Sequence, residues 1–421
     1  MPAMETPEGY RPLDEAGVRE FLAGLPAIAS RLGGQSAGWT MSEVGDGNLN
    51  VVYLVDGPDG SVCVKQSLPY VRVAGESWPL PLERTFFENA YYRHHGAALA
   101  GLVPEVYHYE PALFAIVMER LSPHIILRRG LIAGSIYPTM AQTIGAYVAR
   151  ASYGTSDLAL SLDDKFAGVA EFAANNALRR ITAELIFTHP YRVTDRNRWT
   201  SPQLDDLALA IRSDAELKAA AAWRGHQFLT NAQALIHGDL HTGSIMVTAD
   251  DTRVIDPEFA IYGPIGFDLG ALLANLLMSY FSQPGHETRA GERREQSEWL
   301  LAQVPVFWNA FADTFTALWK QGNSGDAYPA VMLAGDASSD IALERLLAEL
   351  FDDMLGFAGA KTMRRIFGFA HNADFELIAD NDRRAACERR AVTLARRFLV
   401  EPGSFRTAAD IVAAAREAAQ A

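Results

Sequence analysis

The stretch that decides the fold is residues 236–268, which opens as Ile236-His237-Gly238-Asp239-Leu240-His241. A short apolar run at 245–247, a polar segment at 248–252 and a second apolar run at 254–255 follow this polar loop. Such a pattern predicts a strand, a tight turn and a returning strand. The second strand ends at Asp256, so we expect a β-hairpin that brings Asp239 and Asp256 to one end of a sheet.

Three carboxylates in this stretch predict a particular chemistry. One aspartate can serve as a base, while Asp256 and Glu258 offer the hard oxygen ligands that Mg²⁺ prefers. Phosphoryl transfer needs both, because a carboxylate must accept the proton of the attacking hydroxyl and a metal must neutralise the charge of the phosphates. Acids are common, so Asp239 alone would be read as a solvated surface residue. A His-Gly-Asp loop followed by a hairpin and Asp-Pro-Glu is much harder to obtain by accident.

The sequences of these motifs resemble those of the protein-kinase-like phosphotransferases that act on small molecules. This group includes the aminoglycoside and choline kinases. The segments 237–246, 255–259 and 262–268 are most similar to the 5-methylthioribose kinase branch. The resemblance covers roughly residues 40–370 with gaps, which includes parts of both expected lobes. It implies an ATP-dependent kinase that phosphorylates the 1-hydroxyl of 5-methylthioribose in methionine salvage, with ATP and Mg²⁺ bound.

Residue roles in the loop follow from the same resemblance. It implies that Asp239 is the catalytic base and contacts the sugar, and that Asp256 and Glu258 hold the metal. The wider family carries a metal-binding Asn five positions after the base, where this chain has Ser244, so a metal contact by Ser244 is left open. Structural support for the loop is expected from His237 and Asp268.

Composition limits the partners of the chain. Its 421 residues hold 37 basic and 51 acidic side chains, a net charge of −14, which argues against nucleic acid or an anionic membrane as the main partner. The apolar stretch 269–284 falls short of the roughly 20 residues that span a bilayer, so we expect a buried helix there. Cys63 and Cys387 lack metal-type spacing, and the polar N-terminus lacks a signal-peptide core. A cytoplasmic protein with reduced thiols is therefore expected.

A glycine-containing turn is expected between the first strands, which lie between residues 39 and 65. Backbone N–H groups in such a turn can approach phosphates closely, although a plain hairpin turn is the commoner explanation. The nucleotide-binding residues that we expect in this turn are Gly45, Asp46, Gly47, Asn48 and Asn50.

Lys65 strengthens the nucleotide interpretation, because it ends the third strand where kinases place the lysine that binds the phosphates. The chain has no Gly-x-x-x-x-Gly-Lys-[Ser/Thr] run, which disfavours a P-loop fold. An ordinary strand-end lysine is the alternative. The segment 83–95 is expected to be a helix that faces Lys65, with Glu88 as the partner of the lysine and Glu83 as the competing candidate.

A substrate contact by Trp78 and adenine contacts at the hinge are predicted from where these residues lie in the sequence. The proline-rich segment 68–82 is too irregular for a regular element and is similar to the methylthioribose kinase loop that carries a tryptophan, here Trp78. A packing loop is the alternative. After the last two strands of the first lobe, near 103–109 and 114–119, the hinge would contact adenine through backbone groups at Glu119 and Leu121.

The remainder is expected to be mainly helical, with amphipathic runs at 136–153, 170–185, 204–235, 299–319, 340–358, 382–399 and 407–420, and a surface loop at 285–298. Lys361-Thr362-Met363-Arg364-Arg365-Ile366 interrupts the apolar pattern. Adjacent helical arginines usually reach solvent, but the resemblance implies that Arg364 and Arg365 line the sugar pocket, where their donor forks suit oxygen ligands. Whether His371 or Asp374 reaches the same pocket is left open.

Together these observations predict an α+β, bilobal protein-kinase-like fold. Residues 1–121 would form a strand-rich N-terminal lobe with the glycine loop, and residues 122–421 a helical lobe with the catalytic loop and the substrate pocket. The alternatives are a kinase of another small alcohol, such as an aminoglycoside or choline, and a catalytically silent nucleotide-binding module. The resemblance also implies a homodimer.

Overall fold

The computed structural model describes residues 7–45, 49–71, 75–333 and 337–420, with the side chains of 71 and 75–78 excepted. It divides into two compact units, the first formed by Met1–Pro123 with Ile255–Ala260 and the second by His124–Val254 with Ile261–Ala421. The first is rich in strands and the second is mainly helical, so the predicted α+β fold class is confirmed. The predicted assignment of functions to lobes divided after residue 121 stays a prediction.

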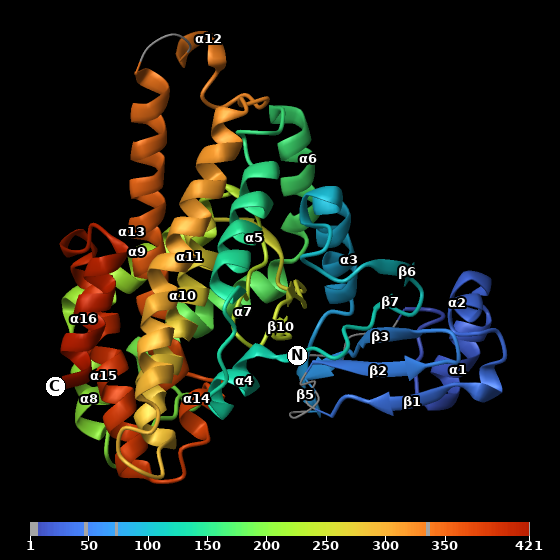
Figure 1. Ribbon diagram of the computed structural model, residues 1–421, viewed down its shortest axis with the longest axis horizontal. Helices are drawn as coiled ribbons and strands as arrows, with labels where there is room; N and C mark the ends of the chain where they lie inside the picture. Colours follow the sequence, from blue (N-terminus) through green and yellow to red (C-terminus); the bar gives the residue numbers. More distant parts are fainter. Residues whose placement is uncertain (1–6, 46–48, 72–74, 334–336, 421) are drawn as a thin grey trace. The chain divides into compact units, whose positions relative to one another are not determined.

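The first unit is built on a five-stranded antiparallel sheet in the order β1-β2-β3-β7-β6 (Figure 1). Its strands are β1 Thr40–Glu43, β2 Asn50–Asp56, β3 Ser61–Ser67, β6 Val106–Glu110 and β7 Ala115–Glu119. Lys65 pairs with Val52 on one side and Ile116 on the other. It therefore lies on the central strand of the sheet, where the backbone is held from both edges.

Successive side chains of each strand point to opposite faces of this sheet, and the two faces pack against different helices. Val62 and Val64 point into a core that also contains Val18 and Leu22 of the N-terminal helices. Lys65 points the other way, toward α3, as its contact with Glu88 shows. The helical segments of this unit are α1 Glu15–Ala23, α2 Pro26–Arg31, η1 Ser36–Gly38, α3 Arg84–His95 and η2 Gly96–Leu99.

The proline-rich segment 68–82 contains more regular structure than expected. Strands β4 Tyr70–Val71 and β5 Gly75–Pro79 form a small antiparallel pair. Prolines are tolerated at the ends and edges of sheets, and Pro79 lies at the end of such a strand, so the expectation of no regular element was wrong.

The second unit consists mainly of helices (Figure 1). Their bounds are α4 Leu127–Ala133, α5 Met140–Gly154, α6 Leu162–Ala173, α7 Asn176–Phe187, η3 His189–Tyr191, α8 Asp205–Ser213, α9 Ala215–Thr230, α10 Ile265–Ser282, η4 Gln283–His286, α11 Arg294–Lys320, α12 Ala330–Leu333, α13 Ser338–Phe367, α14 Ala373–Glu376, α15 Asn381–Val400, η5 Pro402–Ser404 and α16 Ala408–Gln420. Helix α10 packs against α13, and α5 packs against α11.

Several predicted helix boundaries were wrong, because apolar periodicity continues across helix junctions. The run 204–235 is two helices and a strand, broken where the Asp214 side chain caps α9 by accepting from the N–H of Leu217 at 3.0 Å. The run 170–185 is shared between α6 and α7, and the expected loop 285–298 already contains the start of α11. Helix α13 continues through Lys361 and the arginines instead of ending near residue 358.

Short strands frame the polar loop of the second unit. Strand β10 Ile245–Val247 pairs with β11 Thr252–Val254 as the predicted hairpin, with Val247 opposite Thr252. Strand β8 Ile125–Ile126 pairs with the other edge of β10. Strand β9 Ala234–Ile236 pairs with β12 Ile261–Gly263, so both ends of the 237–244 loop start from paired strands.

Helix α10 is the buried centre of the second unit. The segment Ile265–His286 is long and apolar enough to cross a membrane by length and composition alone, but its apolar window is 100% buried inside the protein. The expected buried helix is therefore confirmed. Glycines allow close packing here, because a Cβ added at Gly270 would lie 2.6 Å from the carbonyl oxygen of Met354 and 2.7 Å from the nitrogen of Ala358.

Gly270→Ala is expected to destabilise the protein by about 1–3 kcal/mol, since the added methyl would force α10 and α13 apart. Gly154→Ala is the matched helical control, because a Cβ there meets none of the described residues within 4 Å. The control should be neutral or up to about 1 kcal/mol more stable. Denaturant unfolding of both variants measures the difference, and equal stabilities would contradict the close packing.

Candidate functional site

The 237–244 loop is anchored to the start of α10. The carboxylate of Asp268, which is 4% exposed, accepts from the backbone N–H of His237 at 2.7 Å and of Gly238 at 3.0 Å. Gly238 has a φ of +82°, a conformation that glycine adopts without strain. The loop backbone is therefore fixed by a buried charged acceptor, and the fully buried His237 packs beneath it.

Asp239 extends from this loop into a polar environment, with its side chain 23% exposed. The ammonium group of Lys361 donates to its Oδ1 at 3.0 Å. The Nε2 atom of His241 lies 3.4 Å from its Oδ2. Each carboxylate oxygen thus has a different neighbour.

The tautomer of His241 follows from its other ring nitrogen. Nδ1 lies 3.1 Å from the backbone N–H of Gly243, which can only donate, so Nδ1 accepts. Burial, the largest influence, holds the pKa of His241 well below its ordinary value, so the ring is neutral. Its remaining proton therefore sits on Nε2 and points to Asp239.

Asp239 is held as a carboxylate by positive charge. Burial is the largest single influence and would raise its pKa, but Lys361 and the adjacent Arg364 and Arg365 bring the pKa well below its ordinary value. The neutral His241 contributes a hydrogen-bond dipole rather than a full charge. A carboxylate that stays unprotonated is available to accept a proton.

The two adjacent arginines, which we call the twin arginines, have unpaired donors. Arg365 is 7% exposed and donates through Nη1 to the carbonyl of Ala370 at 2.9 Å. The buried Nε and Nη1 atoms of Arg364 and the Nε of Arg365 have no hydrogen-bond partner among the described residues. Buried donors without partners are costly, so these atoms indicate a place for an oxygen-rich ligand.

Three other residues considered for the site have identifiable neighbours. The hydroxyl of Ser244 lies 3.2 Å from the carbonyl of Asp239 and 3.1 Å from Nδ1 of His241, so it braces the loop. Asp374 is fully buried, with Oδ2 3.5 Å from Nε of Arg128. His371 lies within hydrogen-bond distance, 2.9 Å, of the carbonyl of Arg198. Sugar contacts by His371 or Asp374 stay open.

In the first unit, Lys65 joins two carboxylates. Its ammonium group donates to Glu88 at 2.5 Å and also contacts Asp256. Burial lowers the pKa of Lys65, but Asp256 and Glu88 outweigh that influence and raise it, so the lysine is charged. The backbone of Asp256 has a φ of +69°, a left-handed conformation that is uncommon for residues with a side chain.

Glu258 belongs to a buried network. Its Oε2 accepts from Nδ2 of Asn50 at 2.9 Å and from Nε of Arg84 at 3.2 Å. Arg84, which is 0% exposed, also donates to the carbonyls of Leu49 and Pro81 at 2.7 and 2.6 Å. The start of β2, where the predicted glycine loop ends, is therefore tied to the Asp-Pro-Glu segment.

Some predicted nucleotide and sugar contacts cannot be placed. Asp46, Gly47 and Asn48 lie outside the described residues, as does the side chain of Trp78. A Cβ added at Gly45 would meet no described residue within 4 Å. The backbone N–H of Glu119 donates to the carbonyl of Glu105 at 2.8 Å, and Leu121 is half-buried. Their adenine contacts stay predictions.

The predicted metal ligands can be tested against the chemistry of Mg²⁺. Asp256 fits, because its carboxylate is 43% exposed and is a hard oxygen donor. Glu258 also supplies a carboxylate, but a metal bound there would share that group with Arg84. The described part of the chain contains no group of three or more His, Cys, Asp or Glu side chains that could hold a metal ion. ATP phosphates and water commonly complete such magnesium sites.

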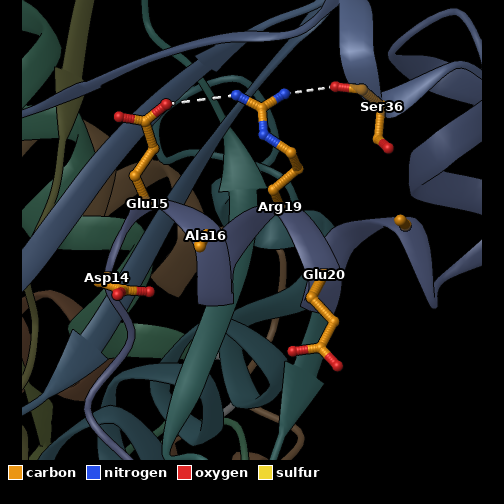
Figure 2. Close-up of a pocket in the computed structure, with 7 residues that line it drawn as sticks. Asp14, Glu15, Ala16, Arg19, Glu20 and Ser36 are labelled. Carbon is orange, nitrogen blue, oxygen red and sulfur yellow. Dashed lines mark hydrogen bonds and ion pairs between the residues drawn. The ribbon is translucent and has the colours of Figure 1, made fainter.

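A shallow groove of about 640 Å³ lies elsewhere in the first unit, along α1. Figure 2 shows Arg19 between Glu15 and Ser36 in this groove, with Asp14 at the start of the helix. None of the predicted nucleotide, metal or sugar ligands lines it. Arg19 already has two backbone acceptors, Ser36 and Trp39, so its charge stabilises the fold.

Comparisons with known proteins identify the family of this chain. Residues 40–307 match the model of the phosphotransferase enzyme family, and the chain belongs to that family of ATP-dependent small-molecule kinases. It is 45% identical over 414 residues to methylthioribose kinase 2 of Oryza sativa subsp. japonica, covering 97% of both chains. It is 42% identical to the methylthioribose kinase of Escherichia coli O45:K1 (strain S88 / ExPEC), covering 97% of this chain and 98% of the relative. Within the phosphotransferases, the chain is thus a member of the methylthioribose kinase family.

A solved structure of a glucosamine kinase aligns with a TM-score of 0.47 at 15% identity, covering 93% of this chain and 85% of that one. The resemblance to methylthioribose kinases read from the motifs is confirmed by the family membership, as is the expectation of an enzyme.

Sequence reasoning missed Lys361, His241 and Arg84 as site residues. Lys361 stands three and four positions before the twin arginines, a spacing that places all three on one helical face. That signal was available, but the expected helix end near residue 358 concealed it. Arg84 has no comparable signal, because the carboxylate that it contacts, Glu258, lies 174 positions away in the sequence.

Proposed function

We propose that this protein transfers the γ-phosphoryl group of ATP to the 1-hydroxyl of 5-methylthioribose, giving 5-methylthioribose 1-phosphate in methionine salvage. The observation that carries the substrate assignment is the likeness to relatives named methylthioribose kinases over 97% of the chain. The arrangement around Asp239 supports the reaction type.

In the proposed reaction, the sugar hydroxyl contacts the exposed part of the Asp239 carboxylate. As the hydroxyl oxygen bonds to the γ-phosphorus, the bond from that phosphorus to the β-phosphate oxygen breaks, and the hydroxyl proton passes to Asp239. The twin arginines hold the sugar oxygens and offset charge on the moving group, for which their unpaired donors are suited. Lys65, fixed by Glu88, holds the nucleotide phosphates, together with the glycine loop.

Asp256 and Glu258 would hold Mg²⁺, which supplies neutralisation of the phosphate charge when bound. Asp256→Asn tests this assignment, because the amide is a weaker ligand than the carboxylate. The variant is expected to need at least about tenfold more Mg²⁺ for half-maximal turnover. Asp250→Asn, an exposed position in the nearby hairpin turn, is the control. An unchanged Mg²⁺ requirement in Asp256→Asn would remove this residue from the metal site.

A kinase for an aminoglycoside or choline is the first alternative. Those substrates are cations, and a pocket for them should offer acids. Here the candidate base is surrounded by Lys361, Arg364 and Arg365, which would repel an ammonium group. The second alternative, a silent nucleotide-binding module, is disfavoured because Lys65, Asp239 and Asp256 are all present.

A coupled assay of ADP release tests the proposal, with ATP, Mg²⁺ and one acceptor at a time: 5-methylthioribose, ribose, choline or kanamycin. Turnover is expected with 5-methylthioribose, and at most weakly with ribose. Turnover with choline or kanamycin instead would replace the substrate assignment and retain the reaction type. Bound ATP with no turnover of any acceptor would favour the silent module.

We also propose a cytoplasmic homodimer. The resemblance to methylthioribose kinases supports this proposal, and light scattering on the purified protein gives the mass of the particle directly. A particle of one chain at micromolar concentration would contradict the dimer.

A further inference from the structure

Lys361 is a buried cation whose charged end lies at the candidate base. It is 3% exposed, and its ammonium group donates to Oδ1 of Asp239 at 3.0 Å. The same group lies 4.5 Å from the ring centroid of Phe267 on α10, so its position is fixed by packing as well as by charge. Lysine is rarely buried without such partners.

We infer that Lys361 is a positioning residue for phosphoryl transfer, which holds the Asp239 carboxylate through Oδ1 so that Oδ2 faces the sugar hydroxyl and can take its proton. The inference rests on the proposed function and adds to it a residue outside the expected motif roles. Lys361 itself makes and breaks no covalent bond. The proton moves from the sugar hydroxyl to Asp239, and the ammonium group keeps its three protons throughout.

The surplus of positive charge supports this role. A structural ion pair would need one cation for one carboxylate, and apolar residues of similar size usually stabilise a core as well as a buried pair does. Asp239 instead faces three cations. Such a surplus suits a site that receives additional negative charge, as the transferred phosphoryl group would bring.

The local geometry also separates the two oxygens of Asp239. Lys361 occupies Oδ1, while the neutral His241 presents its Nε2 proton to Oδ2 at 3.4 Å, a long and weak contact. A sugar hydroxyl can displace or share that weak contact more easily than the charged one. Oδ2 is therefore the oxygen that we expect to accept the proton.

Any pH dependence must include every charged or titratable group near this pair. These neighbours are Arg364 and Arg365 on α13, His241 and its loop, Arg128 on α4, Asp268 on α10 and Asp374 on α14. The arginines stay charged in the ordinary pH range. Burial raises the pKa of Asp268, but its two backbone donors and Lys361 oppose that rise.

Lys361→Met tests the inference, because methionine keeps the apolar stem and removes the charge. We expect kcat to fall about 100-fold, the effect of a misplaced reacting group, with the KM for ATP changed by less than about twofold. Removing the nearest cation must raise the pKa of Asp239. Asp239 acts as a carboxylate, so the acid side of the kcat/KM profile should move toward neutral pH.

Lys361→Gln separates hydrogen bonding from charge. It can still donate to Oδ1, so we expect a smaller fall in kcat than in the methionine variant but the same movement of the pH profile. Lys165→Met is the matched control, because Lys165 is also a buried lysine that pairs with an aspartate, Asp157, on another part of the unit. This control should lose stability without any change in the pH profile.

A double variant tests whether Lys361 acts through Asp239. In the Asp239→Asn background, Lys361→Met should lower kcat by less than about threefold further, since the group that it positions is already lost. A second full 100-fold loss would overturn the positioning role. An unchanged kcat and pH profile in Lys361→Met alone would overturn it too.

Three other outcomes can be distinguished from a failure of the positioning role. If the wild-type protein does not turn over 5-methylthioribose, the proposed function fails and the pH profile is measured with whichever acceptor reacts. If Lys361→Met is unfolded under the assay conditions, the pH profile of kcat/KM is measured with Lys361→Gln instead. If both variants melt, the wild-type profile decides, because an acid side of kcat/KM at the ordinary range of an aspartate would contradict the ionising effect of Lys361.

Discussion

Asp239→Asn is expected to lower kcat by about 100- to 10,000-fold while ATP binding is retained. The amide has nearly the shape of the carboxylate but cannot accept the hydroxyl proton, so the loss should appear in kcat rather than in nucleotide affinity. Steady-state turnover and calorimetric titration with ATP measure the two quantities separately.

The variant leaves the buried Lys361 without its carboxylate partner, so its melting temperature must be compared with that of the wild type. Asp250→Asn, an exposed aspartate of the neighbouring hairpin, serves as the matched control and should retain full activity. Wild-type turnover by a folded Asp239→Asn protein would exclude Asp239 as the base.

Lys65→Met is expected to have the second largest effect, a fall of about 100- to 1,000-fold in kcat, because one fixed positive donor to the phosphates is lost. The KM for ATP should rise as well. The comparison with Asp239→Asn is informative, since that variant should leave nucleotide binding intact. A Lys65→Met protein with normal ATP affinity and normal kcat would remove Lys65 from the nucleotide site.

The same substitution should also destabilise the first unit by about 3–5 kcal/mol, because Glu88 is left buried without its cation. Burial raises the pKa of Glu88 to about 7, and Lys65 opposes that rise. Without the lysine, the pKa of Glu88 must rise further. A carboxyl with a raised folded-state pKa stabilises the fold when protonated and loses that contribution as pH rises through the pKa, so the deficit should be smaller at pH 5.5 than at pH 8.

The double variant Lys65→Met with Glu88→Gln isolates the cause of that deficit. Glutamine keeps the shape of Glu88 and removes its charge, so most of the lost stability should return while turnover stays low. Denaturant unfolding at the two pH values provides the measurement. A deficit that does not depend on pH would show that packing, rather than the unpaired Glu88 carboxyl, is responsible.

The parts of the fold that the sequence predicted are those governed by local patterns. The hairpin of β10 and β11 follows from two apolar runs around a polar turn, and the buried α10 follows from a long uncharged stretch. Boundaries between consecutive helices were not predictable in the same way. The Asp214 cap divides an amphipathic run whose apolar spacing continues on both sides.

The residues of the candidate site also differ in how far the sequence predicts them. Asp239 and Asp256 were proposed as site residues because short motifs carry them, and Lys65 was proposed because of its position at the end of a strand. Lys361 and Arg84 were missed because their importance lies in contacts with residues 122 and 174 positions away. Long-range pairing of this kind is set by tertiary packing, which a single sequence does not display.

The measurement that most directly tests the central claim is phosphorus NMR of the product formed from ATP and 5-methylthioribose. Beside the resonances of ADP, we predict one new phosphate-monoester resonance that couples to the proton on carbon 1 of the sugar, and none after the same incubation time when Asp239→Asn replaces the wild type. Coupling to protons at carbon 2 or 3 would contradict the assigned hydroxyl. A spectrum with only ATP, and no new phosphate ester after long incubation, would contradict the proposed activity itself.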